Sequence, residues 1–176
     1  MIETARLRLI PATRDCLEAE LVRDHAKLGA LLGARVDEGC PPDLYDAGAM
    51  QWTLDAYNRE PAFRDWGMLY FVSKEAPALI GVGGYKGPPR DGVIELGYSV
   101  VPPRQRQGFA TEATLGMTAH AFANPEIARV IAHTLAELVA SIGVLEKAGF
   151  RLQPDTLEEG AIMFAIDRAD WGPSPC

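Results

Sequence analysis

The spacing of apolar residues along the chain changes several times, and each change marks the start of a new predicted element. Residues 6–10 alternate between polar and apolar positions and end at a proline, which predicts a first strand. Thr13 then suits the N-cap of one helix whose leucines recur at positions 17, 21, 28 and 32. Glycine and proline at residues 39–42 interrupt this pattern, and helical spacing returns over residues 49–59. The first third of the chain therefore predicts a strand followed by two helices.

Beyond residue 67 the period is that of strands, with turns marked by glycine and proline. The predicted elements are strands over residues 68–73, 79–85 and 93–100, a helix over 109–122, a strand over 128–134, a helix over 140–148 and a strand over 161–166. Gly149 suits the left-handed position after the second of these helices, and Phe150 suits the apolar contact that follows. Within strand 93–100 the apolar stripe includes Ile94 and Leu96, whereas Glu95 lies on the opposite face.

The connections predict the fold class. Only strand 93–100, helix 109–122 and strand 128–134 together have the length of a parallel crossover, and the short turns elsewhere favour antiparallel pairing. We therefore expect one α/β domain of the α+β type over residues 1–176, with a mostly antiparallel sheet, one parallel βαβ unit and a loose tail from about residue 168. Ligands in such sheets bind beyond the carboxyl ends of the parallel strands, which points to residues 100–108.

Composition and charge narrow the function classes. Lys and Arg number 17 against 24 Asp and Glu, and the net charge of −7 argues against nucleic-acid binding, which needs a basic face. An acidic surface instead attracts a cation such as a protonated amine. The chain has no apolar run long enough to predict a membrane span, and its first residues lack the features of a secretion signal. We therefore expect a cytoplasmic protein with no membrane partner.

Metal and thiol chemistry have little support in the sequence. The three cysteines form no Cys-x-x-Cys pair, and His25, His120 and His133 lack the spacing of metal ligands. We therefore expect no metal site and treat the histidines as ordinary surface or core residues. A catalytic triad centred on one histidine remains as a minor alternative.

The hexapeptide Gln105-Arg106-Gln107-Gly108-Phe109-Ala110 joins a predicted strand to the start of a predicted helix. A helix N-terminus offers free N–H groups and partial positive charge, which together suit a phosphate. Gly108 would let backbone and ligand approach closely. A tight polar turn without a ligand is the equal alternative. The loop is neither a Walker loop nor a dinucleotide fingerprint, because the Gly-Lys-Ser/Thr and the triple glycine are both missing.

This loop matches the Q/R-x-x-G-x-G/A signature of the GNAT N-acetyltransferases, and the chain resembles that family over nearly its whole length. Residues 95–100 resemble the family's fourth strand, and residues 108–113 resemble the start of its third helix. The stretch ASIGVLEKAGF at residues 140–150 and the opening residues 4–9 are similar to the RimJ/RimL-like branch. Several weak motifs in the right order are far more specific than any one of them alone.

The resemblance implies the GNAT fold, with helices on both faces of the sheet, and acetyl-CoA as co-substrate without a metal. Pantetheine would pair with an exposed strand edge. A main-chain N–H near Val100 or Val101 would stabilise the oxyanion. The cofactor-binding residues that the resemblance implies are Val100, Val101, Gln105, Arg106, Gln107, Gly108, Phe109, Ala110 and Thr111.

Acetyl transfer requires removal of a proton from the amine and stabilisation of the departing thiolate. Glu95 is the candidate base, directly or through a water; a structural or substrate-binding carboxylate is the equal alternative. Ser141 matches the serine that RimJ/RimL-like members place near the thioester sulfur, with a helix cap as its alternative. Leu145 stands where many other members have a tyrosine. Leu138 and Gly143 replace a frequent asparagine and arginine.

The expected function is transfer of an acetyl group to a primary amine, on a protein N-terminus or a small molecule, by direct attack in a ternary complex. A non-catalytic coenzyme A sensor is the main alternative, and a nucleotide-phosphate binder is a weaker one. A monomer or a homodimer is expected. The acceptor would lie between residues 34–50 and the region after residue 150. Its candidate lining residues are Asp37, Glu38, Asp43, Tyr45, Asp46, Trp52 and Trp66, and the alternative for each is a solvated loop charge or a core aromatic.

Overall fold

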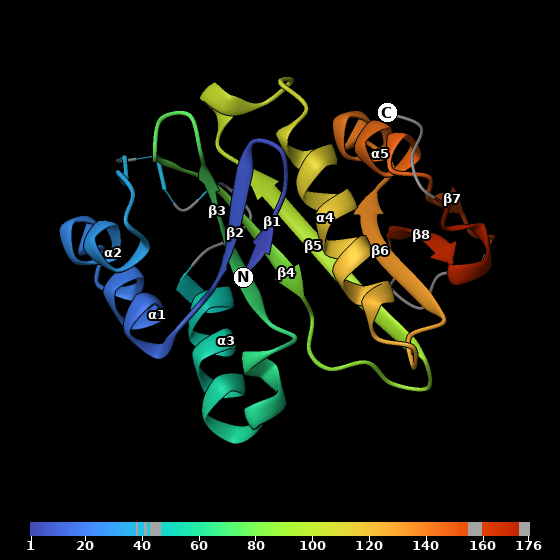
Figure 1. Ribbon diagram of the computed structural model, residues 1–176, viewed down its shortest axis with the longest axis horizontal. Coiled ribbons are helices and arrows are strands. Elements are labelled where there is room, and N and C mark those ends of the chain that lie inside the picture. The colour runs from blue at the N-terminus through green and yellow to red at the C-terminus, as the bar shows by residue number, and fades with distance from the viewer. Residues whose placement is uncertain (38, 41, 43–46, 155–159, 173–176) are drawn as a thin grey trace.

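The computed structural model describes residues 1–37, 39–40, 42, 47–154 and 160–172, and it is built on one twisted sheet (Figure 1). The strands lie in the order β1-β2-β3-β4-β5-β6-β8-β7, and every neighbouring pair is antiparallel except β5 and β6. Their bounds are β1 Ile2–Glu3, β2 Leu7–Pro11, β3 Met68–Ser73, β4 Leu79–Tyr85, β5 Val93–Val100, β6 Arg129–Leu135, β7 Arg151–Leu152 and β8 Ala161–Asp167. The predicted mostly antiparallel sheet with one parallel crossover is confirmed.

Helices cover both faces of this sheet, as expected. They are α1 Arg14–Leu21, α2 His25–Leu32, α3 Ala47–Arg59, α4 Phe109–Ala123 and α5 Val139–Lys147, with short 3-10 turns η1 Pro61–Arg64, η2 Pro102–Arg104 and η3 Arg168–Asp170. The hydrogen bonds of three tyrosine hydroxyls show which helices lie on each face of the sheet. Tyr85 donates to Met117 O of α4 at 2.7 Å and Tyr98 to Ser141 O of α5 at 3.1 Å, whereas Tyr70 points the other way and bonds Glu20 of α1.

The first helical region is where the sequence prediction is wrong, because two helices form in place of one. Arg23 adopts a left-handed backbone with φ of 56° and ends the first helix. Asp24 then begins the second helix, since its carboxylate accepts the Lys27 N–H at 3.0 Å. Leu17 and Leu28 are buried as the leucine pattern predicts. The pattern alone did not reveal the break because hydrophobic spacing continues across it.

The C-terminal end of the described chain is bound to the body of the protein, so the expectation of a loose segment from residue 168 is wrong for residues 168–171. The Arg168 guanidinium donates to the main-chain oxygens of Phe122, Asn124 and Ile127. Trp171 packs against the Phe122 ring with centroids 5.8 Å apart. These contacts anchor the end of β8 on the α4–β6 connection. Residues 173–176 lie outside the described part.

Candidate active site

The parallel pair β5 and β6 separates soon after it forms, and this separation defines the centre of the site. The strands are paired at only three positions, where Val93, Ile94 and Glu95 lie opposite Arg129, Val130 and Ile131. Beyond Glu95, β5 continues to Val100 with β4 as its only partner among the described strands. One edge of β5 is therefore open between Glu95 and the end of the strand.

The hydrogen-bond alternation of β5 decides which N–H groups point into this gap. Glu95 O accepts from Lys86 N and Val101 N–H donates to Ile80 O, both at 3.0 Å, so these residues face the β4 side. Alternate residues of a strand face opposite sides, and the N–H of Val100 therefore points toward β6. The resemblance implies Val100 or Val101 as the oxyanion donor. The geometry of Val100 fits this role, whereas the N–H of Val101 already donates to Ile80 O.

The loop after β5 turns its backbone to solvent at the start of α4. Gln105 is held beside the strand end, since its Nε2 donates to Val100 O at 2.9 Å. Arg106 and Gly108 both adopt left-handed backbone conformations, with φ of 60° and 83°. Residues 105–108 are exposed. Successive main-chain N–H groups in such a turn form a concave anion site.

The N-terminus of α4 has free donors at this turn. Its N-cap, Gly108, has no side chain to accept a bond. The Glu112 N–H, 3.0 Å from Gly108 O, is the first helical N–H with a main-chain acceptor. The N–H groups of residues 109–111 have no intrahelical partner, which is the general property of a first turn. A cavity of about 550 Å³ adjoins Gly108 and Thr111, so the turn is open rather than occluded. The donor set fits a diphosphate.

A carboxylate in the first turn of α4 would repel such a ligand, but its charge is compensated. Glu112 Oε2 lies 2.6 Å from Arg6 Nε, and the Thr4 hydroxyl and the Arg6 main-chain N–H both donate to Glu112 Oε1. Partial burial raises the pKa of Glu112, but these hydrogen bonds outweigh it and hold the pKa below its ordinary value. Arg6 also donates to Gln107 O at 3.0 Å and lies over the Phe109 ring. A cation therefore stands beside the turn.

Glu95 lies where β5 and β6 separate, and two basic side chains meet its carboxylate. His133 Nδ1 lies 2.9 Å from Glu95 Oε1, and Lys86 forms an ion pair with the same oxygen. The His133 side chain is 10% exposed, and its Nε2 is buried without a hydrogen-bond partner among the residues that the structure describes. The sequence interpretation of His133 as an ordinary residue missed this contact. Only the β5–β6 register brings the two side chains to one face, so the signal was not local.

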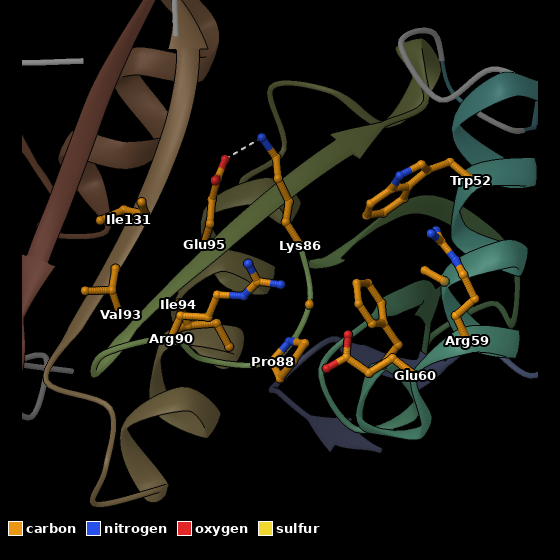
Figure 2. Close-up of a pocket in the computed structure, with 13 residues that line it drawn as sticks. Trp52, Arg59, Glu60, Lys86, Pro88, Arg90, Val93, Ile94, Glu95 and Ile131 are labelled. Atoms are coloured by element: carbon orange, nitrogen blue, oxygen red, sulfur yellow. Dashed lines mark ion pairs between the residues drawn. The ribbon is translucent and has the colours of Figure 1, made fainter. Parts of the chain in front are cut away.

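A second cavity, of about 560 Å³, opens on the Glu95 face of the sheet between β5 and α3 (Figure 2). Trp52, one of the residues expected on the acceptor side, lines this cavity. Asp37 instead pairs with Arg35 at 2.8 Å, and Trp66 packs edge-on against Tyr85, so neither lines this cavity. The other predicted lining residues, Glu38, Asp43, Tyr45 and Asp46, lie outside the described residues.

Ser141 lies on the opposite face, at the start of α5. The N-cap of α5 is Leu138, so the alternative interpretation of Ser141 as a cap is wrong. The Ser141 Oγ is 3.2 Å from the Tyr98 hydroxyl, which also donates to Ser141 O. Burial raises the pKa of Tyr98 to about 12, so this phenol is a neutral donor near pH 7. Leu145, which replaces the frequent tyrosine, is fully buried.

Comparison with known proteins identifies the family. Residues 6–151 match the acetyltransferase (GNAT) domain model, and the chain therefore belongs to the GNAT acetyltransferase family. It is accordingly an acetyl-CoA-dependent acyltransferase. The match covers both the loop at the start of α4 and the separation of β5 from β6.

Relatives share this architecture at low sequence identity. An uncharacterized N-acetyltransferase, YjdG, of Bacillus subtilis (strain 168) is 27% identical over 160 residues, which cover 90% of this chain and 94% of YjdG. An acetyltransferase from Agrobacterium tumefaciens has a TM-score of 0.64 at 21% identity, covering 95% of this chain and 94% of its own. RimL, a ribosomal L7/L12 α-N-protein acetyltransferase solved with coenzyme A, has a TM-score of 0.64 at 16% identity. The match covers 93% of this chain and 95% of the RimL chain. The part of the chain that the structure describes has no helix long and apolar enough to cross a membrane.

Proposed function

We propose that this protein transfers an acetyl group from acetyl-CoA to a primary amine by direct attack in a ternary complex. The observation that carries the proposal is the open edge of β5. It runs from Glu95, at the border of the Figure 2 cavity, to Val100, beside the anion-binding turn of α4. An acyl donor lying along this edge would meet an amine arriving from the cavity.

The diphosphate of acetyl-CoA would bind the free N–H groups at residues 108–111, with the Arg6 guanidinium nearby. Pantetheine would pair with the open edge of β5 in the manner of an added strand. The thioester carbonyl would then lie near the Val100 N–H, which would donate to the oxyanion as the amine nitrogen attacks. The Tyr98 contact holds the start of α5, and with it Ser141, against β5.

Glu95 would accept a proton from the acceptor ammonium, directly or through a water. The Lys86 contact supports this role, since it demonstrates that a primary ammonium can reach the Glu95 carboxylate. A hydrogen bond from His133 Nδ1–H would orient the Glu95 carboxylate toward the acceptor. Once the amine is neutral, its lone pair attacks the thioester carbonyl and forms the new C–N bond. Collapse of the resulting oxyanion then breaks the C–S bond, and the nitrogen releases its second proton to water.

Ser141 would donate a hydrogen bond to the departing thiolate. A serine hydroxyl is a poor acid, so stabilisation of the thiolate is the proposed role, with its proton taken up from water. Tyr98 positions this serine from the strand, because its hydroxyl reaches both the main-chain and the side-chain oxygen of Ser141. Leu145 offers no donor of its own.

The test is release of free thiol when the protein, acetyl-CoA and a panel of primary amines are incubated together, with mass spectrometry of the acetylated products. We expect thiol release that requires both an amine and the protein. Binding of coenzyme A without any amine-dependent release would instead identify the sensor function. A thermal shift with ATP but none with coenzyme A would identify a nucleotide-phosphate binder. Glu95→Gln is the matched variant, and it should bind coenzyme A as the wild type does.

A further inference from the structure

The Figure 2 cavity carries more positive than negative charge, although the whole chain has a net charge of −7. Its cationic lining residues are Arg59, Lys86 and Arg90, and its carboxylates are Glu60 and Glu95. The overall charge suggested an acidic acceptor region that attracts a simple cationic amine. The cavity does not fit that expectation, because an isolated ammonium would meet three cations against two carboxylates there.

Two of these cations are available to a ligand. Arg90 has no ion pair or side-chain hydrogen bond within the described residues, and Arg59 uses only Nε, which donates to Asp55 O at 3.3 Å. Figure 2 shows Arg90 reaching across the cavity from the β4–β5 connection, and Arg59 standing on α3 at the far wall. A guanidinium in this state retains several N–H donors in the fork that matches a carboxylate or a phosphate.

The remaining lining is apolar, and Trp52 and Phe63 are its aromatic residues. Trp52 is 53% exposed and meets the Phe63 ring edge-on, with centroids 5.8 Å apart. An exposed tryptophan beside a cavity offers apolar area to a bound molecule at low entropic cost. The cavity volume of about 560 Å³ falls in the range of small-molecule sites, and it would also admit the first residues of a peptide.

From these observations we infer that the acceptor is a primary amine that also carries an anionic group, a carboxylate or a phosphate, a few bonds from the nitrogen. The amine lies at Glu95, where it displaces the Lys86 ammonium, and the anion lies at Arg90 and Arg59. This inference rests on the proposed function, since it names the substrate class of the same site. The anionic group offsets the repulsion between the acceptor ammonium and the cationic lining.

The test uses tripeptide amides that share one N-terminal alanine, so that the reacting amine is constant. The third residue is phenylalanine in every peptide, and only the second residue varies. One set of peptides has aspartate, asparagine or lysine at the second position, and the other set has phosphoserine or serine there. We expect kcat/KM to fall in the order aspartate, asparagine, lysine, with aspartate preferred over asparagine by about 10-fold. Comparison of the aspartate and phosphoserine arms identifies which anion is preferred. Raising the salt from about 0.05 to 0.5 M should reduce the preference, because the Debye length shortens.

Arg59→Gln and Arg90→Gln should each reduce the preference for the anionic peptide by about 3-fold, and the double variant should nearly abolish it. The KM for acetyl-CoA should stay constant. Arg64→Gln is the matched control, because Arg64 is exposed on η1 but does not line the cavity. Equal kcat/KM for the aspartate, asparagine and lysine peptides would overturn this inference alone. Absence of acetylation of every peptide and every other amine would overturn the proposed function together with it.

Discussion

Replacement of Gly108 by alanine tests the proposed diphosphate site at residues 105–110 most directly. The backbone φ of Gly108 is 83°, a conformation in which a side chain is strained. A Cβ at this position would lie 3.3 Å from Arg6 Nη2, the flexible end of a partly exposed side chain that can move aside. The steric cost within the protein is therefore small, and the left-handed backbone accounts for most of the loss of stability. We expect about 1–2 kcal/mol, or a fall in Tm of roughly 2–8 °C.

The effect on coenzyme A binding should be larger than this loss of stability explains. A methyl group at residue 108 separates the diphosphate from the first N–H groups of α4 and weakens at least one hydrogen bond to a charged group. Such a bond contributes about 1.5–3 kcal/mol, which predicts an increase of roughly 10- to 150-fold in the Kd for coenzyme A. Gly108→Trp should abolish binding. Isothermal titration calorimetry measures the Kd, and differential scanning calorimetry measures the Tm.

Gly33→Ala is the matched control for this experiment. Gly33 also has a left-handed backbone, with φ of 59°, at the C-cap of α2, and nothing lies within 4 Å of a Cβ built there. Its substitution should cause a similar loss of stability and leave coenzyme A binding unchanged. If Gly108→Ala and Gly108→Trp both bind coenzyme A like the wild type, residues 105–110 do not hold the diphosphate and the reasoning fails.

The remaining predictions concern three carboxyl and hydroxyl groups. Glu95→Gln should lower kcat by about 10²- to 10⁴-fold near pH 7, because the amine then depends on solvent for deprotonation, and raising the pH toward about 9 should recover part of the rate. Ser141→Ala should lower kcat with little change in the KM for the acceptor, as measured by thiol release. Burial raises the pKa of Glu20 to about 7, so the folded state favours its protonated form and loses stability as the pH rises from about 5 to 8. Glu20→Gln should flatten that pH dependence in urea unfolding and keep an acceptor for the Tyr70 hydroxyl.

Each of these predictions has a result that contradicts it. Glu95 is not the base if Glu95→Gln keeps the full rate at every pH. Ser141 has only a structural role if Ser141→Ala and Tyr98→Phe lower the Tm together but leave kcat unchanged. The argument for Glu20 fails if the wild type and Glu20→Gln lose stability in parallel between about pH 5 and 8.

Local sequence patterns predicted most elements of the fold closely. The bounds predicted for residues 68–73, 79–85 and 93–100 are those of β3, β4 and β5, because alternation and flanking turn residues are local signals. Gly149 is left-handed with φ of 87°, and the Phe150 N–H bonds Leu145 O at 3.0 Å, as the helix-end motif predicted. The two-residue strands β1 and β7 were missed, since two residues carry no period.

The sequence by itself indicated the class of protein, because the turn of residues 105–110 and the other motifs that resemble the GNAT family each consist of consecutive residues and occur in the family's order. Only the tertiary structure brings Glu95 into contact with His133, because the two residues are 38 positions apart and lie on the paired strands β5 and β6. It also places the Tyr98 hydroxyl beside Ser141. The sequence also did not reveal the charge of the Figure 2 cavity. That charge depends on Arg59 of α3 and Arg90 of the β4–β5 connection lining the same cavity. Residues so distant along the chain become neighbours only when the helices pack on the sheet.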